Sequence, residues 1–118
     1  MLGRTGRPAW HAAGEGEGVG RMLFAMICWD RPGALEVRLA TRPAHLDWIE
    51  RHRTAVIAAG PMLDDAGSPI GSLFVIEAAD EAAARAFAAT DPYAAAGLFA
   101  EVEIRPFRLV YKDGARVG

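Results

Sequence analysis

The residues RPAHLDWIERH, positions 42–52, decide how this chain is expected to fold. Pro43 fits the first position of a helix, where its missing N–H removes no helical hydrogen bond. Thr41, two residues earlier, is suited to the N-cap. Apolar residues then recur at helical spacing, which predicts a helix from Pro43 to about Ala59 with one buried stripe. The members of this stripe are Leu46, Ile49, Val56 and Ile57.

His45 falls inside this apolar stripe and not on the charged face of the helix. One hypothesis is a hydrogen-bonded core histidine. The other is a general acid or base at the bottom of a pocket. His52 falls on nearly the same line, two turns later, which suggests a metal site with His45 and Asp91. Two turns span about 10 Å, too far for one ion with ligands at about 2 Å, so we predict no metal and no cofactor.

Composition excludes several classes of protein. A length of 118 residues fits one domain. A net charge of −2, without a basic patch, argues against nucleic-acid binding. No apolar run reaches the roughly 20 residues of a membrane span, so no membrane partner is expected. The single cysteine, Cys28, cannot form an internal disulfide, and its apolar neighbours predict a buried, inert thiol in a cytoplasmic protein.

The periodic pattern begins at Met22 and divides the chain into three parts. Residues 1–21 are rich in glycine and predict a disordered extension, with Met22 as an alternative translation start. Residues 22–112 form the expected domain, and residues 113–118 a loose tail. The expected elements are a strand at 22–29, a short helix at 34–40, the helix from Pro43 to about Ala59, a brief strand at 62–63, a strand at 72–77, a helix from Asp80 to about Ala89, a helical turn at 94–98 and a strand at 99–111.

The order strand–helix–strand–strand–helix–strand is typical of an α+β, ferredoxin-like fold. Such a fold is an antiparallel sheet with both helices on one face. Pro106 in the last strand predicts an edge position or a bulge. Because nothing in the chain remains to cover the second, apolar face of the sheet, we expect a homodimer, a dimeric α+β barrel.

Several short motifs together resemble one known family. The motifs are Arg42-Pro43-Ala44-His45, Ala59-Gly60-Pro61-Met62, Gly71-Ser72, Asp91-Pro92-Tyr93, Gly97-Leu98-Phe99 and Ile104-Arg105-Pro106-Phe107. In these motifs, the chain resembles the YciI-like (YCII-related domain) family over residues 22–112. The resemblance implies a ferredoxin-like dimer, related in architecture to muconolactone isomerases.

The resemblance also implies a site and a kind of activity. Its proposed catalytic pair corresponds to His45 and Asp91, and its substrate-binding residues to Ser72, Tyr93 and Arg38 or Arg42. The implied activity is of a lyase or isomerase type on a small acidic or aromatic molecule, including dehydrochlorination of chlorinated aromatic degradation products.

A histidine–aspartate pair suits such chemistry. The carboxylate accepts one imidazole N–H and fixes the tautomer, and the second ring nitrogen then moves a proton. An arginine holds a substrate carboxylate in bidentate fashion. Two alternatives stay open, a non-catalytic domain that binds or senses a small ligand, and a structural domain without a site.

Overall fold

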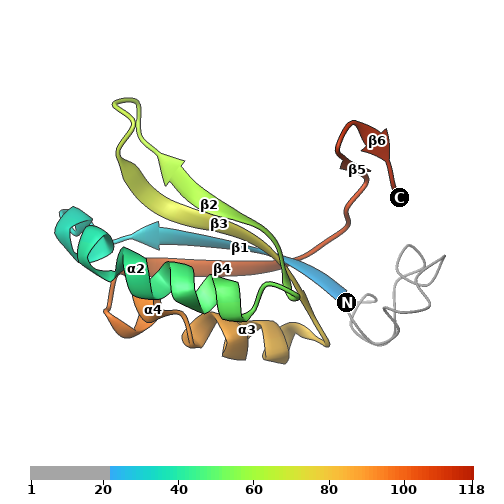
Figure 1. The fold of residues 1–118 in the computed structure, drawn as a ribbon, viewed down its shortest axis with the longest axis horizontal. Helices are drawn as coiled ribbons and strands as arrows, with labels where there is room; N and C mark the ends of the chain where they lie inside the picture. Colours follow the sequence, from blue (N-terminus) through green and yellow to red (C-terminus); the bar gives the residue numbers. More distant parts are fainter. Residues whose placement is uncertain (1–21) are drawn as a thin grey trace.

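A four-stranded antiparallel sheet, in the order β2-β3-β1-β4, forms the body of the computed structural model, which describes residues 22–118 (Figure 1). The extension expected at residues 1–21 lies outside the described residues. The elements are β1 (Met22–Asp30), α2 (Leu35–Arg51), β2 (Val56–Leu63), β3 (Pro69–Ala78), α3 (Glu81–Ala89), α4 (Pro92–Ala95), β4 (Phe99–Phe107), β5 (Tyr111–Lys112) and β6 (Ala115–Arg116).

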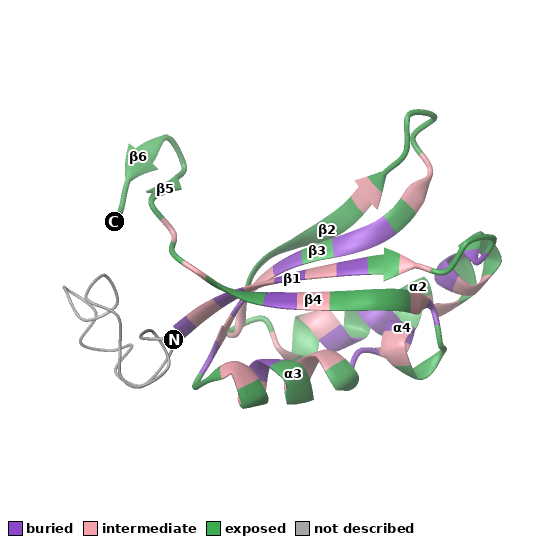
Figure 2. Ribbon diagram, turned by 180° about the vertical axis from the view of Figure 1, so that it is seen from behind, coloured by how far each residue is buried: buried purple, intermediate pink, exposed green. Residues whose placement is uncertain are grey.

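The helices cover one face of the sheet, as Figures 1 and 2 show from opposite sides. Every second residue of the central strands points toward them. Phe24 and Met26 of β1 and Phe74 and Ile76 of β3 are buried there, together with Trp48 of α2. This arrangement confirms the expected ferredoxin-like fold with helices on one side of an antiparallel sheet.

Helix α2 is one continuous helix that contains Pro43 in its interior. Pro43 was expected to restart or to bend the helix; the predicted restart and the predicted N-cap at Thr41 are wrong. A proline inside a helix removes one backbone hydrogen bond. The buried side chains of Arg38, His45 and Trp48 hold the helix against the sheet on both sides of this position, and such packing contributes more to helix stability than local propensity does.

The segment after α2 is a strand, where the sequence predicted the end of a helix. The helix ends at Arg51, and β2 begins at Val56, six residues before the expected strand. Val56 and Ile57 therefore belong to the sheet and not to a helical stripe. A short apolar run fits either element. Here the β-branched side chains and the pairing with β3 favour the strand, and Gly60 lies opposite Leu73 in that ladder.

The second half of the chain follows the prediction more closely. Asp80 caps α3 by accepting a hydrogen bond from the backbone N–H of Ala83 at 2.8 Å. The expected helical turn is present as α4, two residues earlier than predicted. None of the helices within residues 22–118 combines the length and hydropathy that crossing a bilayer requires.

The last strand of the sheet is shorter than expected. β4 ends at Phe107 rather than Tyr111, and Pro106 lies on this edge strand opposite Phe24, as the proline predicts. The chain then leaves the sheet, and β5 and β6 form a separate small hairpin (Figure 1).

The face of the sheet away from the helices is largely apolar over β1 and β3, whereas the edge strand β4 presents Glu101, Glu103 and Arg105 there. The alternate residues of β1 and β3 that point outward include Ile27, Leu73 and Val75, and Leu73 is 44% exposed in the single chain. No helix covers this face in the described part of the chain (Figure 2).

Candidate functional site

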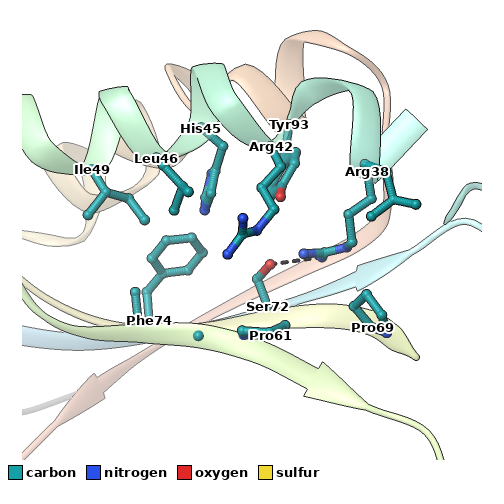
Figure 3. Close-up of a pocket in the computed structure, with 13 residues that line it drawn as sticks. Arg38, Arg42, His45, Leu46, Ile49, Pro61, Pro69, Ser72, Phe74 and Tyr93 are labelled. Atoms are coloured by element: carbon teal, nitrogen blue, oxygen red, sulfur yellow. Dashed lines mark hydrogen bonds between the residues drawn. The ribbon is translucent and has the colours of Figure 1, made fainter. Parts of the chain in front are cut away.

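A pocket of about 260 Å³ lies between α2 and the sheet, over the pairing of β2 with β3 (Figure 3). This volume is near the lower end of the range for small-molecule sites, so it suits a ligand of about one ring. Its walls are mainly apolar, from residues that include Leu39, Leu46, Ile49, Pro61, Pro69 and Phe74. Its polar side chains are Arg38, Arg42, His45, Ser72 and Tyr93.

His45 joins this pocket to a buried carboxylate. Its Nδ1 lies 2.8 Å from Oδ1 of Asp91, and Asp91 is only 1% exposed. The imidazole itself points from α2 into the pocket (Figure 3), whereas Asp91 is not among the residues that line it. The carboxylate therefore acts on the ligand space only through the ring of His45.

The sequence Asp91-Pro92-Tyr93 explains how this pair is built. Asp91 is the N-cap of α4, and its Oδ1 also accepts a hydrogen bond from the backbone N–H of Tyr93 at 2.9 Å. Pro92 occupies the first turn, where a missing N–H is tolerated. This short turn places the Tyr93 ring parallel to the imidazole of His45, with ring centres 3.9 Å apart.

Arg38 lies beside this stack and is held by a carboxylate that the sequence analysis did not single out. Its Nε and one terminal nitrogen bind the two oxygens of Asp30 at 2.7 and 2.9 Å. The same terminal nitrogen donates to Oγ of Ser72 at 2.9 Å, and the guanidinium lies 4.7 Å from the centre of the Tyr93 ring. Burial is the largest single influence on Arg38 and works to lower its pKa, but the hydrogen bond and charge of Asp30, together with Tyr93, outweigh burial in sum, so the pKa is raised and the cation persists.

The sequence carried a signal for Arg38 and a weaker one for Asp30. Arg38 precedes His45 by seven residues, two helical turns, and so shares its face of α2. Asp30 directly follows the strand predicted at 22–29, where aspartate is common in turns, and in the structure it is the last residue of β1. After β1 the chain turns back, so that α2 lies over the sheet. Only this arrangement in space brings the Asp30 carboxylate to Arg38.

Arg42 and Tyr93 complete the polar part of the pocket. Within residues 22–118 no hydrogen bond or ion pair joins Arg42 to another side chain, and its guanidinium points into the pocket (Figure 3). Burial raises the pKa of the Tyr93 phenol above its ordinary value, against the opposing charges of Arg38 and Arg42. The phenol is therefore a neutral hydroxyl at neutral pH.

His52 does not share the pocket of His45. Its Nδ1 donates to the backbone carbonyl of Trp48 at 2.8 Å, and its ring packs edge-on against Phe87. In the described part of the chain, no group of three or more His, Cys, Asp or Glu side chains is placed to hold a metal ion.

Cys28 lies beneath the site, paired with Ser72 across β1 and β3. Burial, together with the negative charges of Asp91 and Asp30, raises the pKa of its thiol to about 12, although Arg38 opposes the increase. The thiolate that a nucleophile requires is therefore not formed near neutral pH. This agrees with the prediction of an inert, buried cysteine.

Fold and pocket together define a small ferredoxin-like protein with a histidine–aspartate pair beside a pocket for a small ligand. The model of the YCII-related domain family matches residues 22–108, and the chain belongs to this family. The resemblance noted in the sequence is thus confirmed.

Relatives of known sequence support the same assignment. Protein YciI of Escherichia coli O6:H1 is 36% identical over 98 residues, which cover 76% of this chain and 100% of that protein. An uncharacterized protein of Haemophilus influenzae is 32% identical over the same length, with the same coverage of both chains.

One solved structure adds chemistry to the comparison. It is the 5-chloro-2-hydroxyhydroquinone dehydrochlorinase TftG from Burkholderia phenoliruptrix AC1100, in complex with 2,5-dihydroxybenzoquinone. The two proteins are 33% identical, with a TM-score of 0.68, over 74% of this chain and 94% of TftG.

Proposed function

We propose that this protein is an enzyme that moves protons on a small aromatic or quinonoid molecule, with His45 as the base and Asp91 as its partner. The observation that carries the proposal is the 2.8 Å contact between Nδ1 of His45 and the buried Asp91, on an imidazole that lines a pocket. Nε2 has no hydrogen bond within residues 22–118, so this nitrogen is free to exchange a proton with a ligand.

The pair suits proton transfer because its two members have separate tasks. Asp91 accepts the Nδ1–H bond, which leaves the lone pair on Nε2. When Nε2 takes a proton, the buried carboxylate stabilises the imidazolium. Proton transfer by such a positioned group typically accelerates a reaction about 10²- to 10⁴-fold.

Elimination of hydrogen chloride from a chlorinated hydroquinone is the reaction class that we favour. His45 first takes a proton from a ring hydroxyl and returns it to the carbon that bears chlorine, which gives a cyclic ketone. It then takes a second hydroxyl proton, the O–H electron pair forms a second carbonyl, and chloride leaves with the C–Cl electron pair. The substrate loses one H⁺ and one Cl⁻ in total, and the steps need no oxidant or reductant.

Two observations support an aromatic substrate. The pocket is small and apolar, with Phe74 and the ring of Tyr93 among its walls, and flat rings fit against such surfaces. TftG, which shares a third of its residues with this chain, acts on a chlorinated hydroxyhydroquinone.

We further propose that the protein works as a homodimer in the cytoplasm. The outward apolar face of β1 and β3 is the surface that a second copy would cover. The chain has one cysteine, which is buried and unpaired, as is common for proteins of a reducing compartment.

The test of this function is an assay with the native chain and 5-chloro-2-hydroxyhydroquinone under exclusion of oxygen. Chloride release and the rise of quinone absorbance are followed together, because elimination yields both in equal amounts. Chloride release and quinone formation that are faster with the protein than without it support an enzymatic function. Saturable binding of the same compound without chloride release or any other change of the compound would instead identify a binding or sensing domain.

A further inference from the structure

The two arginines of the pocket differ in one respect, namely whether a carboxylate neutralises them. Arg38 is paired on two atoms with Asp30, and the side chains of this pair are only 5% and 7% exposed. Its remaining donor capacity is partly used by Ser72 at 2.9 Å. A guanidinium so engaged adds little net charge to the pocket, since Asp30 carries the opposite charge within hydrogen-bonding distance.

Arg42 has no such partner. It lies one helical turn after Arg38 and lines the same pocket. No carboxylate within residues 22–118 lies within ion-pairing distance of it, and its guanidinium points toward the space in front of Ser72 and Tyr93 (Figure 3). Arg42 is therefore the arginine of this pocket whose charge has no carboxylate in direct contact within the described residues.

We infer that Arg42 is the anion-binding residue of this pocket, and that Asp30 confines Arg38 to positioning Ser72 and Tyr93. The ligand is then a planar ring that carries an ionised oxygen, such as an enolate or phenolate. This inference rests on the proposed function in taking the same pocket as the substrate pocket. It concerns binding alone, so that it stands or fails separately from the role of His45.

The positive charge of Arg42 lies in the same pocket as the proposed base, His45, where it can stabilise the product of proton removal. A ring hydroxyl that loses its proton carries negative charge on oxygen, in the first step until the ring carbon is protonated and in the second until chloride departs. A guanidinium at that oxygen stabilises the charge with two parallel N–H donors. Tyr93 contributes a neutral hydroxyl to the same wall and adds no competing negative charge.

The probes that test this inference are 2,5-dihydroxybenzoquinone and its dimethyl ether. Each hydroxyl of the first compound is conjugated to a carbonyl across a ring double bond, so it ionises as a carboxylic acid does. The ether has the same ring and cannot ionise. Calorimetric titration of both probes is carried out on the native chain, on Arg42→Gln and on Arg51→Gln, which removes an exposed arginine of the same helix outside the pocket.

We expect Arg42→Gln to bind the ionised quinone at least tenfold more weakly, as loss of a charged hydrogen bond does. Its affinity for the ether should stay within about threefold of the native value. Arg51→Gln should resemble the native chain, and added salt should weaken only the native and Arg51→Gln complexes with the ionised probe. Equal affinity of Arg42→Gln and Arg51→Gln for that probe, or no preference of the native chain for it over the ether, would overturn the inference.

The same titration separates this inference from the proposed function. His45→Gln removes the proposed base and leaves Arg42 in place, so it should retain the preference for the ionised quinone. Loss of turnover without loss of this preference is expected. If the native chain selects the ionised probe through Arg42 but does not turn over the chlorinated substrate, the proposed catalytic function is contradicted and the anion-binding role of Arg42 is retained.

Discussion

The imidazole of His45 lies flat against the phenol ring of Tyr93, with ring centres 3.9 Å apart and planes inclined by 19°. Asp91 holds the edge of the same imidazole through Nδ1. One contact fixes the plane of the ring and the other fixes its rotation within that plane. Because Asp91 and Tyr93 are two residues apart in one short turn, a single local structure orients the proposed base.

The first prediction concerns the carboxylate of this turn. Asp91→Asn removes the negative charge and keeps an oxygen that can cap α4 and accept the Nδ1–H bond. We expect kcat for dehydrochlorination to fall about 100-fold or more, because the imidazolium loses its stabilising charge. Initial rates of chloride release at saturating substrate measure this change.

Thermal unfolding of Asp91→Asn provides the control for this prediction. A cooperative transition near that of the native chain indicates that the turn has survived. An Asp91→Asn variant that is folded and has native kcat would show that the carboxylate serves the turn only.

The second prediction concerns the motif Gly71-Ser72. A Cβ atom at Gly71 would lie 2.5 Å from the carbonyl oxygen of Cys28 and 2.6 Å from the terminal methyl of Met62. Gly71→Ala should therefore lower the free energy of unfolding by about 1–3 kcal/mol, the usual cost of overpacking. Denaturant unfolding measures the change.

Gly60 in the neighbouring strand is the matched control. A Cβ atom there meets nothing within 4 Å, and its backbone has no positive φ. Gly60→Ala should be neutral or more stable by up to about 1 kcal/mol. Equal destabilisation by both variants would contradict the assignment of Gly71 as a residue of close backbone packing.

The third prediction concerns pH. The thiol of Cys28 has a pKa of about 12 in the folded protein, against an ordinary value of 9.0. The unfolded chain therefore releases this proton first as the pH rises, and the folded state loses stability between these two values. Below pH 9.0 the contribution is fully present.

Comparison with Cys28→Ala isolates this effect, because the other titrating groups are common to both proteins. The stability advantage of the native chain over Cys28→Ala should shrink from about pH 8 to about pH 10.5. Chemical denaturation at a series of pH values measures it. An advantage that stays constant over this range would mean that the folded thiol ionises as an ordinary cysteine does.

The fourth prediction concerns the uncovered face of the sheet. If a second copy covers this face, Leu73→Lys should convert the dimer into a monomer, since a buried ammonium without a partner is costly. Light scattering coupled to size exclusion gives the mass. Val110→Lys is the control, because Val110 is 43% exposed, close to the 44% of Leu73, but lies outside the sheet. A native monomer, or a dimeric Leu73→Lys, would contradict this interface.

The sequence pattern was sufficient to predict the order of the elements, whereas the polar residues that line the pocket had been named only through the family resemblance. The strand starting at Met22, the start of a helix at Asp80 and the edge position of Pro106 all follow from local chemistry, and the structure has them. The orientation of His45 toward the core also followed from helical spacing, and Ile49 packs against the core as predicted. The rest of the predicted stripe was wrong, because Leu46 is exposed and Val56 and Ile57 belong to β2.

The errors have a common physical origin, because they lie where tertiary contacts outweigh local preference. Pro43 is tolerated inside α2 because buried side chains on both sides of it pack on the sheet. Val56 and Ile57 join β2 because β3 offers a pairing partner, a partner that no local window reveals. The role of Asp30 was not predicted for the same reason, since its ion pair with Arg38 depends on how α2 packs over the sheet.

The most direct test of the account compares His45→Gln with His52→Gln in kcat and in affinity for 2,5-dihydroxybenzoquinone. The two variants make the same change on the same helix, and only His45 lines the pocket. We predict that His45→Gln lowers kcat by about 100-fold or more while the dissociation constant stays within about threefold, and that His52→Gln keeps both values near native. Equal kcat values for the two folded variants would contradict the assignment of His45 as the base.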